Sequence, residues 1–492
     1  FKQKTAYEIM PSLVGSEMCI RDRFKSNTDF GLTAVKIYPN SGGVPLPITT
    51  LINSFNYVET ITSPFLSATM EVVDSGGLLQ GLPMQGGEIV EITVSTSINE
   101  SLTYSLAIWK IGNRFAQNQK QAYTIGLISP EALNNEVTRV TKPLEGNPEK
   151  IITNLLQESL NTQKEFFSEP SLFDTKILPN RKRVFDLINA MAVKSVSPQA
   201  KFDQTKDTTT SEANTSQSVR GSAGFFFWES KRGYNFFSVD SLCADNDSGL
   251  KSKKLESPSW GPYIEKIANQ GEGADDRFVV YRSTFGSELD LMSSLRRGKY
   301  SSMVVFFNHS TGQYEEYVYK IKDSYDNMAH LGGQEGITLI PSNQVELSDY
   351  PSRIMSIYLD HESWYNEKTP ASPDPKDGST APTKFADWQK FYAAQSLARY
   401  QLLKNQVCTI VIPGNPDICA GDKIDIRLSS KLPNAEAKKD QYDIESSGTY
   451  LINEATHAYD TTVGTNGRFT TTLRLMRDSY GLKDRPSNHG TK

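Results

Sequence analysis

Hydrophobic and polar residues alternate along much of the chain between residues 30 and 130. The alternation is clearest at 68–72, 90–94 and 123–127, where apolar side chains occupy every second position. A period of two residues is typical of β-strands with one buried face, and clusters of Gly and Pro mark the turns between them. The pattern therefore predicts an antiparallel sheet in this region.

The period changes to that of a helix at three places. Asn147 and Pro148 form a helix start, because Asn caps free backbone N–H groups and Pro fits the first turn, and apolar residues follow at helical spacing to Leu160. Residues 183–193 predict a second, amphipathic helix, and 384–404 predict a third that is rich in aromatic residues. We interpret the apolar faces of the first two helices as core-packing surfaces.

Two hairpins and two polar segments lie among these helices. The first hairpin spans 224–239 and carries four consecutive aromatic residues that require burial on both faces, and the second spans 302–322. Residues 201–222 have almost no large apolar side chains and predict a loop, whereas the four prolines within 366–383 predict an extended linker. Strands resume at 406–480.

One strand pattern occurs twice. Residues 87–92 (GEIVEI) and 421–426 (GDKIDI) share a glycine, an acid and alternating Ile or Val with a second acid. Each is followed by a further strand, at 123–127 and at 469–473. Similarities of six residues between strands often arise by chance, but strand order and strand chemistry agree in both copies. We take the pair as a hypothesis of two related barrels.

Composition and charge narrow the class of protein. The 492 residues suggest about three domains, and 37% of them are hydrophobic, which is enough for packed cores. The 52 basic and 57 acidic residues give a net charge of −5, which disfavours specific nucleic-acid binding. No apolar run approaches the roughly 20 residues that span a bilayer, and the mean hydropathy is −0.45.

The sequence offers no recognisable catalytic or metal-binding set. The motifs G-x-x-x-x-G-K-[ST] and G-x-S-x-G are absent, and the five histidines stand far apart. The four cysteines are scattered, which predicts reduced thiols rather than a disulfide framework: Cys19, Cys243, Cys408 and Cys419. Two carboxylates suffice for glycoside hydrolysis, so sequence does not exclude that chemistry. We predict a structural protein, not an enzyme, with no cofactor.

Residues 1–23 are expected to be foreign to the protein. A short apolar run at 10–14 is interrupted at Gly15, too early for the 7–15 apolar residues of a secretory signal. The segment resembles translated read-through of a sequencing adapter. We exclude it from the fold prediction.

The C-terminal third carries motifs that resemble a known family. These are residues 411–416 (VIPGNP), 420–424 (AGDKI), 447–452 (SGTYLI), His457 and 471–479. They are similar to the closing strands of the central baseplate hub protein of T-even-type contractile phages, a pattern shared with the hub part of type VI secretion spikes. The positions that carry the resemblance are Gly87, Glu88, Gly414, Gly421, Asp422, Gly448, His457, Arg477 and Asp478.

The resemblance implies a mainly β fold with α+β insertions. It contains two similar antiparallel, tail-tube-like β-barrels, the second discontinuous, and two smaller mixed domains. The implied division is a first barrel at 24–130, an α+β domain at 131–223, a second barrel formed by 224–245 and 405–480, an inserted mixed domain at 246–404 and a tail at 481–492.

The resemblance also implies a function. Three copies would form a ring that joins the tail tube to the spike protein and surrounds the DNA path, without specific nucleic-acid binding or stable membrane insertion. Such a protein is part of the virion tail baseplate and is assembled in the host cytoplasm. Two alternatives from other classes stay open at this point: a tail-associated peptidoglycan hydrolase and a host-binding tail adhesin.

Overall fold

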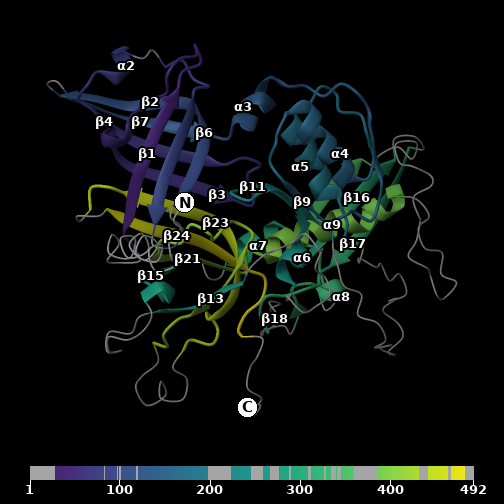
Figure 1. Cartoon of the computed structure of the whole chain (residues 1–492). Helices are drawn as coiled ribbons and strands as arrows, with labels where there is room; N and C mark the ends of the chain where they lie inside the picture. Colours follow the sequence, from purple (N-terminus) through teal and green to yellow (C-terminus); the bar gives the residue numbers. More distant parts are fainter. Residues whose placement is uncertain are drawn as a thin grey trace, which may run out of the picture.

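The computed structural model describes residues 28–81, 84–96, 98, 101–117, 120–197, 223–244, 259–265, 276–286, 290–308, 312–325, 328–333, 339–340, 345–358, 385–431, 442–463 and 467–482. The predictions for 1–23, for the loop 201–222 and for the linker 366–383 lie outside these residues. The described chain is mainly β, with one 14-stranded mixed sheet accompanied by smaller sheets and helices (Figure 1).

The first region of the large sheet confirms the strands predicted between residues 30 and 130. All its strand pairs are antiparallel, in the spatial order β3-β4-β7-β6-β5-β1, and β2 extends the sheet beside β1. Alternate residues such as Met70, Ile92 and Ile125 are buried in a common core. The elements are β1 (Phe30–Tyr38), β2 (Leu46–Pro47), η1 (Thr49–Leu51), β3 (Ile52–Thr60), β4 (Ser67–Asp74), α2 (Leu78–Gly81), β5 (Ile89–Thr96), β6 (Leu102–Gln117) and β7 (Lys120–Ile128).

The second region of the large sheet has the spatial order β15-β21-β24-β23-β22-β13. Its own core contains Ile410, Ile424, Tyr450 and Leu473. The elements are β13 (Ser259–Glu265), η3 (Asp276–Phe278), β14 (Val279–Val280), β15 (Arg282–Phe285), β21 (Gln406–Pro413), β22 (Lys423–Arg427), β23 (Gly448–Asp460) and β24 (Arg468–Arg477).

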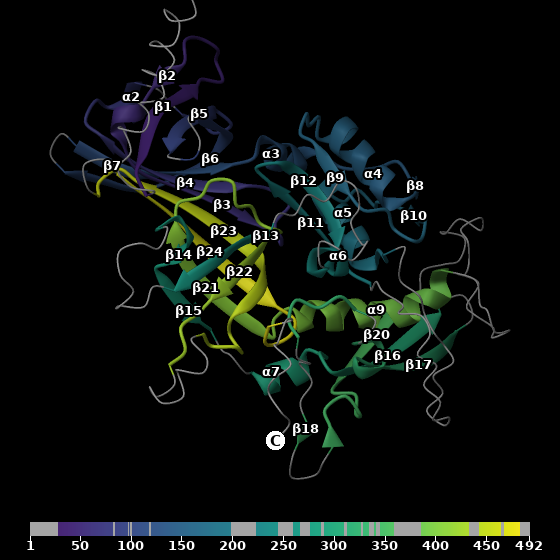
Figure 2. The same ribbon diagram turned by 60° about the horizontal axis from the view of Figure 1, so that its bottom comes forward.

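The two regions repeat the same set of six strands. Along the chain, β1, β3, β4, β5, β6 and β7 correspond in order to β13, β15, β21, β22, β23 and β24, and each strand has the corresponding neighbours. One pair differs, because β1 and β5 are antiparallel whereas β13 and β22 are parallel. The regions are joined where residues 454–460 of β23, beyond the part of β23 that pairs with β22, pair with β3, the edge strand of the first region, so they form one continuous sheet (Figure 2).

Residues 130–244 form a separate α+β region beside the large sheet (Figure 1). The predicted helix start is confirmed, since the Asn147 side chain accepts a 3.1 Å hydrogen bond from the Glu149 N–H and Pro148 begins the helix. The amphipathic helix α5 is confirmed as well, with its apolar face buried. The elements are α3 (Pro130–Val137), β8 (Leu144–Gly146), α4 (Pro148–Asn154), η2 (Leu155–Ser159), β9 (Phe166–Ser168), β10 (Thr175–Ile177), α5 (Val184–Lys194), β11 (Phe225–Ser230), β12 (Gly233–Ser238) and α6 (Val239–Cys243).

Strand pairing differs from the division expected at 224–285. The hairpin β11–β12 is present as predicted, but β12 pairs with β9 in a three-stranded sheet and not with the strands of 405–480. Residues 259–285, expected in the insertion, instead supply β13, β14 and β15 to the large sheet. A hairpin sequence specifies the pairing of its own two strands. The strand that pairs with the outer edge of the hairpin comes from a distant part of the chain and is set by the tertiary fold.

Residues 290–402 form a second mixed layer. The strands β17, β16 and β20 make a three-stranded sheet, and the predicted aromatic-rich helix, α9, packs against one face of it (Figure 2). The hairpin predicted at 302–322 is confirmed by the pairing of β16 with β17. The elements are α7 (Leu291–Arg296), β16 (Ser301–Asn308), β17 (Gln313–Lys320), α8 (Lys322–Tyr325), β18 (Leu339–Ile340), β19 (Val345–Glu346), β20 (Arg353–Tyr358) and α9 (Phe385–Leu402).

Candidate functional site

The repeated glycine–acid motif adopts the same backbone arrangement in both regions. Gly87 and Gly421 have φ angles of +87° and +91°, a conformation that strongly favours glycine. The Gly87 N–H donates to the Ile108 carbonyl at 2.7 Å, and the Gly421 N–H donates to the Ile452 carbonyl at 2.9 Å. In return, the N–H of each isoleucine donates to the carbonyl of the acid that follows the glycine. Each motif thus fixes the entry of its strand into the sheet.

The two acids of the motif have different environments. The Glu88 carboxylate accepts hydrogen bonds from the N–H groups of Gln85 and Gly86, so it closes its own turn. The Asp422 carboxylate accepts from the Cys419 N–H and also from Arg232 and Trp260.

The contact of Asp422 with Arg232 is bidentate, at 2.7 and 2.9 Å. Burial raises the pKa of Asp422, and the contact with Arg232 opposes this shift. Arg232 lies in the turn between β11 and β12, so this ion pair connects the α+β region to the second sheet region.

A buried glutamate adds a second connection at the same place. One oxygen of Glu59, in β3, accepts hydrogen bonds from the Tyr57 hydroxyl at 2.8 Å and from the Lys231 N–H at 2.6 Å. The other oxygen accepts from the Ala420 N–H at 3.1 Å. Burial raises the pKa of Glu59, and these hydrogen bonds oppose the shift. One side chain thus joins the first sheet region, the α+β hairpin and the second sheet region.

Arg477 and Asp478, at the end of β24, lie in a third buried group. Arg399, from α9, contacts Asp478 at 2.7 Å and Asp240, from α6, at 3.0 Å. The Asp478 carboxylate also contacts the Nδ1 atom of His330 at 2.8 Å. Although burial acts in the opposite direction, Arg399 and His330 hold the pKa of Asp478 well below its usual value.

Arg477 fixes the end of the second region. Its guanidinium donates to the Ser447 carbonyl and lies 4.5 Å from the centre of the Tyr450 ring. A Cβ atom at Gly448 would lie 2.8 Å from this guanidinium, and the φ angle of Gly448 is +131°. The arrangement therefore requires glycine at this position.

Gly414 and His457 pack around the loop that leads to Gly421. A Cβ atom at Gly414 would lie 2.0 Å from the Phe469 ring. The His457 Nε2 atom contacts the Ile418 carbonyl and its Nδ1 atom contacts the Thr471 hydroxyl, both at 3.1 Å. Burial lowers the pKa of His457 to about 4, so the ring is neutral and donates through Nε2.

The positions carrying the family resemblance are thus structural and do not converge on one site. Four of them surround the loop before β22, three lie at the opposite end of that region, and Gly87 and Glu88 lie in the first region. Among the described residues, no three His, Cys, Asp or Glu side chains are placed to hold a metal ion. Within the same residues, no helix has the length and apolarity to cross a membrane. Cys243, Cys408 and Cys419 are free and buried.

Two surface features were not found from the sequence. The first is the face of the β17-β16-β20 sheet that points away from α9. Cross-strand rows place Val318, Met303 and Ile354 side by side, and likewise Tyr314, Phe307 and Tyr358. Ile354 and Tyr358 are 69% and 73% exposed. Contiguous apolar surface of this kind is typical of interaction sites.

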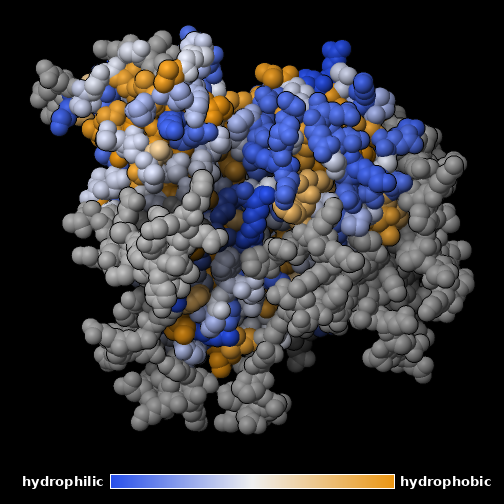
Figure 3. Space-filling model, viewed as in Figure 1, coloured by the Kyte–Doolittle hydropathy of each residue, from blue (hydrophilic) through white to orange (hydrophobic). Residues whose placement is uncertain are grey.

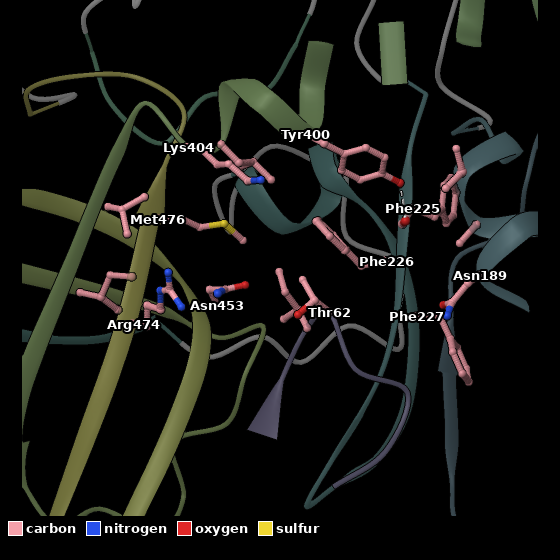
Figure 4. A pocket seen from close by; sticks show the side chains of 16 residues that line it. Thr62, Asn189, Phe225, Phe226, Phe227, Tyr400, Lys404, Asn453, Arg474 and Met476 are labelled. Carbon is pink, nitrogen blue, oxygen red and sulfur yellow. Dashed lines mark hydrogen bonds between the residues drawn. The ribbon is translucent and has the colours of Figure 1, made fainter. Parts of the chain in front are cut away.

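The second feature is a cavity of about 520 Å³ between the large sheet, α5, β11 and the end of α9 (Figure 4). Phe226, the one ring of the predicted aromatic run that is not fully buried, lines it. On the face shown in Figure 3, hydrophilic residues gather over the α+β region, and hydrophobic residues reach the surface over the first sheet region.

No protein-family model matches the sequence, and no curated protein matches it. Solved structures similar to this chain include a tail protein from Neisseria meningitidis, with 11% identity over 93% of this chain and 99% of that chain and a TM-score of 0.48. A 43 kDa tail protein of prophage MuSo2 from Shewanella oneidensis has 7% identity over 92% of this chain and 99% of that chain, with a TM-score of 0.45.

A third similar structure is a component of the E. coli type VI secretion system, itself described as similar to the T4 bacteriophage tail proteins gp27 and gp5. It has 8% identity over 92% of this chain and 79% of that chain, with a TM-score of 0.38. The structural neighbours of this chain are therefore phage tail proteins and type VI secretion spike-related proteins, the two classes to which the sequence resemblance points.

Proposed function

We propose that this protein is a structural component of a contractile phage tail, the central hub of its baseplate. The observation that carries the proposal is the repeat of six strands in the same chain order and with the same neighbours, each copy with its glycine–acid loop. Three chains with two such units each supply six similar positions, which match a six-fold tail tube. The hub motifs in the sequence point to the same role.

The proposal treats each six-stranded region as a tail-tube-like barrel. In the second region, β15 pairs with β21 and β14 pairs with β13, and only Tyr281 separates β14 from β15. The Phe469 N–H, in β24 of the second region, donates to the Thr28 carbonyl at 2.6 Å, so β23 and β24 together reach both edges of the first region, β3 and the start of β1. These contacts favour closure of both sheets. The barrels would then comprise residues 24–130 and, with the pairing observed, 259–285 together with 405–480.

In this proposal the trimer joins the tail tube to the spike and surrounds the path of the DNA, and it has no catalytic role. Assembly takes place in the host cytoplasm, and the finished protein belongs to the virion tail. The exposed apolar face of the β17-β16-β20 sheet supports a role in assembly, because exposed apolar surface in adjacent rows is unfavourable unless a partner covers it.

The mass of the full chain in solution tests the proposal. Light scattering during size-exclusion chromatography is expected to give about 165 kDa, three times the chain mass of 54.9 kDa. A single species of chain mass at micromolar concentration would overturn the trimer. Co-purification with the spike protein of the same genome tests the hub role separately.

A further inference from the structure

The cavity of about 520 Å³ has an apolar wall built by distant parts of the chain. Phe226 lines it from β11, Val193 from the end of α5, and Met476 from β24. Val193 is 46% exposed, so this side of the cavity is open to solvent. The volume lies within the range of about 300–1,000 Å³ that is typical of cavities holding small ligands.

Two cations lie against this apolar wall. Figure 4 shows Lys404 and Arg474 on the same side of the cavity, with Met476 between them and the strand 225–227 opposite. The two side chains come from adjacent segments, because Lys404 forms a β-bridge with Arg477, three residues after Arg474 on β24. Their proximity is therefore set by backbone pairing.

Neither cation has an ionic partner among the residues that the structure describes. Glu454 lies opposite Arg474 on β23, but the two form no ion pair. The other polar side chains at the cavity are neutral: the amides of Asn453 and Asn189 and the hydroxyls of Thr62 and Tyr400, of which the last donates to the Phe225 carbonyl. The cavity thus combines apolar contact area with positive charge and a few neutral hydrogen-bonding groups.

This combination selects an apolar ligand that ends in a carboxylate. A carboxylate accepts charge-assisted hydrogen bonds from lysine and arginine, and these are about twice as strong as neutral ones. An apolar group beside it would displace water from Phe226 and Met476. Capture of a C-terminal carboxylate is a recurring mode of peptide recognition.

We propose that this cavity binds the C-terminal end of a partner chain, with the carboxylate at Lys404 and Arg474 and a bulky apolar side chain against Phe226. The lining residues all belong to one chain, so the site exists in a single protomer. The proposal is therefore independent of the trimer, and a monomeric protein would still bind the peptide.

Two peptides that differ only in charge test the proposal by isothermal titration calorimetry with the full chain. Acetyl-Ala-Leu-Phe with a free carboxylate is expected to bind at least about tenfold more tightly than its C-terminal amide. Equal affinity of the two peptides, or no heat of binding at about 5 mM of the free acid, would overturn the proposal.

Substitutions locate the binding. Lys404→Gln combined with Arg474→Gln is expected to weaken binding of the free acid at least about tenfold and to leave the amide unchanged. Both residues are exposed, so the fold is expected to survive, which the melting temperature checks. The matched control combines Lys36→Gln with Arg468→Gln, two exposed cations away from the cavity, and is expected to bind like the unchanged chain.

Decanoate, which also joins an apolar group to a carboxylate, tests whether the ligand is a free fatty acid and not a peptide. Binding of decanoate that depends on Lys404 and Arg474, without binding of the peptide, would show that the site takes a free fatty acid and that the peptide assignment is wrong. Peptide binding that is unaffected by the double substitution would overturn the site itself.

Discussion

The two six-stranded regions differ most in what connects their second and third strands. In the first region, residues 61–66 join β3 to β4, whereas in the second region residues 286–405 lie between β15 and β21. The same strand set thus tolerates a connection of very different length, because loop-closure entropy grows slowly with length. The long connection carries α9 and the exposed sheet face.

The regions also differ in how they use charge. The glycine–acid loop of the first region is closed by local hydrogen bonds to Glu88, but that of the second contacts Arg232 from another region. Buried ion pairs of Arg399 similarly attach α9 to Asp478 at the end of β24 and to Asp240 in α6. Both regions contact the α+β region, the first through Glu59 and the second through Asp422, but only the second also holds α9 by a buried ion pair.

The largest expected effect comes from Arg399, which has no counterpart in the first region. Arg399→Met leaves Asp240 buried without a positive partner and Asp478 with only its contact to His330, and loss of one partner from a buried pair costs about 3–5 kcal/mol. Urea unfolding monitored by circular dichroism measures the loss. Arg183→Met, which breaks an exposed pair with Glu136, is the control and is expected to change stability by about 0.5 kcal/mol or less. Similar effects of the two substitutions would contradict the assigned role of Arg399.

Alanine substitutions at the two glycines of the repeated motif separate the cost of backbone strain from the cost of steric crowding. Gly87→Ala and Gly421→Ala both place a side chain at φ near +90°, but the new Cβ atom at 421 would lie 2.5 Å from the Trp228 ring. At 87 the nearest atom, in Asn40, is 3.5 Å away. We therefore expect Gly421→Ala to cost about 3 kcal/mol and Gly87→Ala about 1 kcal/mol. Equal losses in urea unfolding would show that Trp228 does not crowd a side chain at position 421.

Substitutions of the two acids of the motif are expected to differ less in their effect on stability. Asp422→Asn removes the charge that binds Arg232, whereas Glu88→Gln weakens only hydrogen bonds from backbone N–H groups. Because Arg232 is partly exposed and partly solvated, we expect a loss of about 2 kcal/mol for Asp422→Asn, against about 1 kcal/mol for Glu88→Gln. Melting temperatures of the two variants give the order, and a reversed order would refute the comparison.

These comparisons show which features of the structure can be predicted from the sequence and which cannot. The strands, the helix start at Asn147 and the glycine–acid loops were predictable, because alternation, capping and positive φ depend on residues close together in the chain. The contact between Glu59 and Ala420 spans 361 residues, and no local pattern encodes it.

The same limit applies to the hairpin β11–β12 and to the cavity. The hairpin was predicted, but its pairing with β9 was not, since many edges of similar chemistry compete for one strand. Lys404 and Arg474 read in sequence as ordinary surface charges, and only the fold brings both to the cavity at Phe226.

An effect that develops only as the pH rises concerns Lys299, another group with no counterpart in the first region. Its ammonium is buried where the connection meets β21, contacting the side chain of Asn405 and the Tyr300 ring. Burial lowers the pKa of Lys299 to about 8, below the value of about 10.4 in an unfolded chain. Between these two pH values the unfolded chain binds the proton and the folded chain does not, so Lys299 makes stability rise with pH.

Lys299→Met removes this contribution. The free energy of unfolding of the variant relative to the unchanged chain is therefore expected to fall by up to about 2 kcal/mol between pH 7.5 and pH 10, and to be constant below pH 7.5. Taking the difference cancels the ionisation of buried tyrosines, which both proteins share. Lys322→Met, at an exposed pair with Glu346, is the control and is expected to show no such trend. A flat difference for Lys299→Met would mean that water reaches this ammonium, and that the residues around Lys299 pack on the second region less tightly than α9 does.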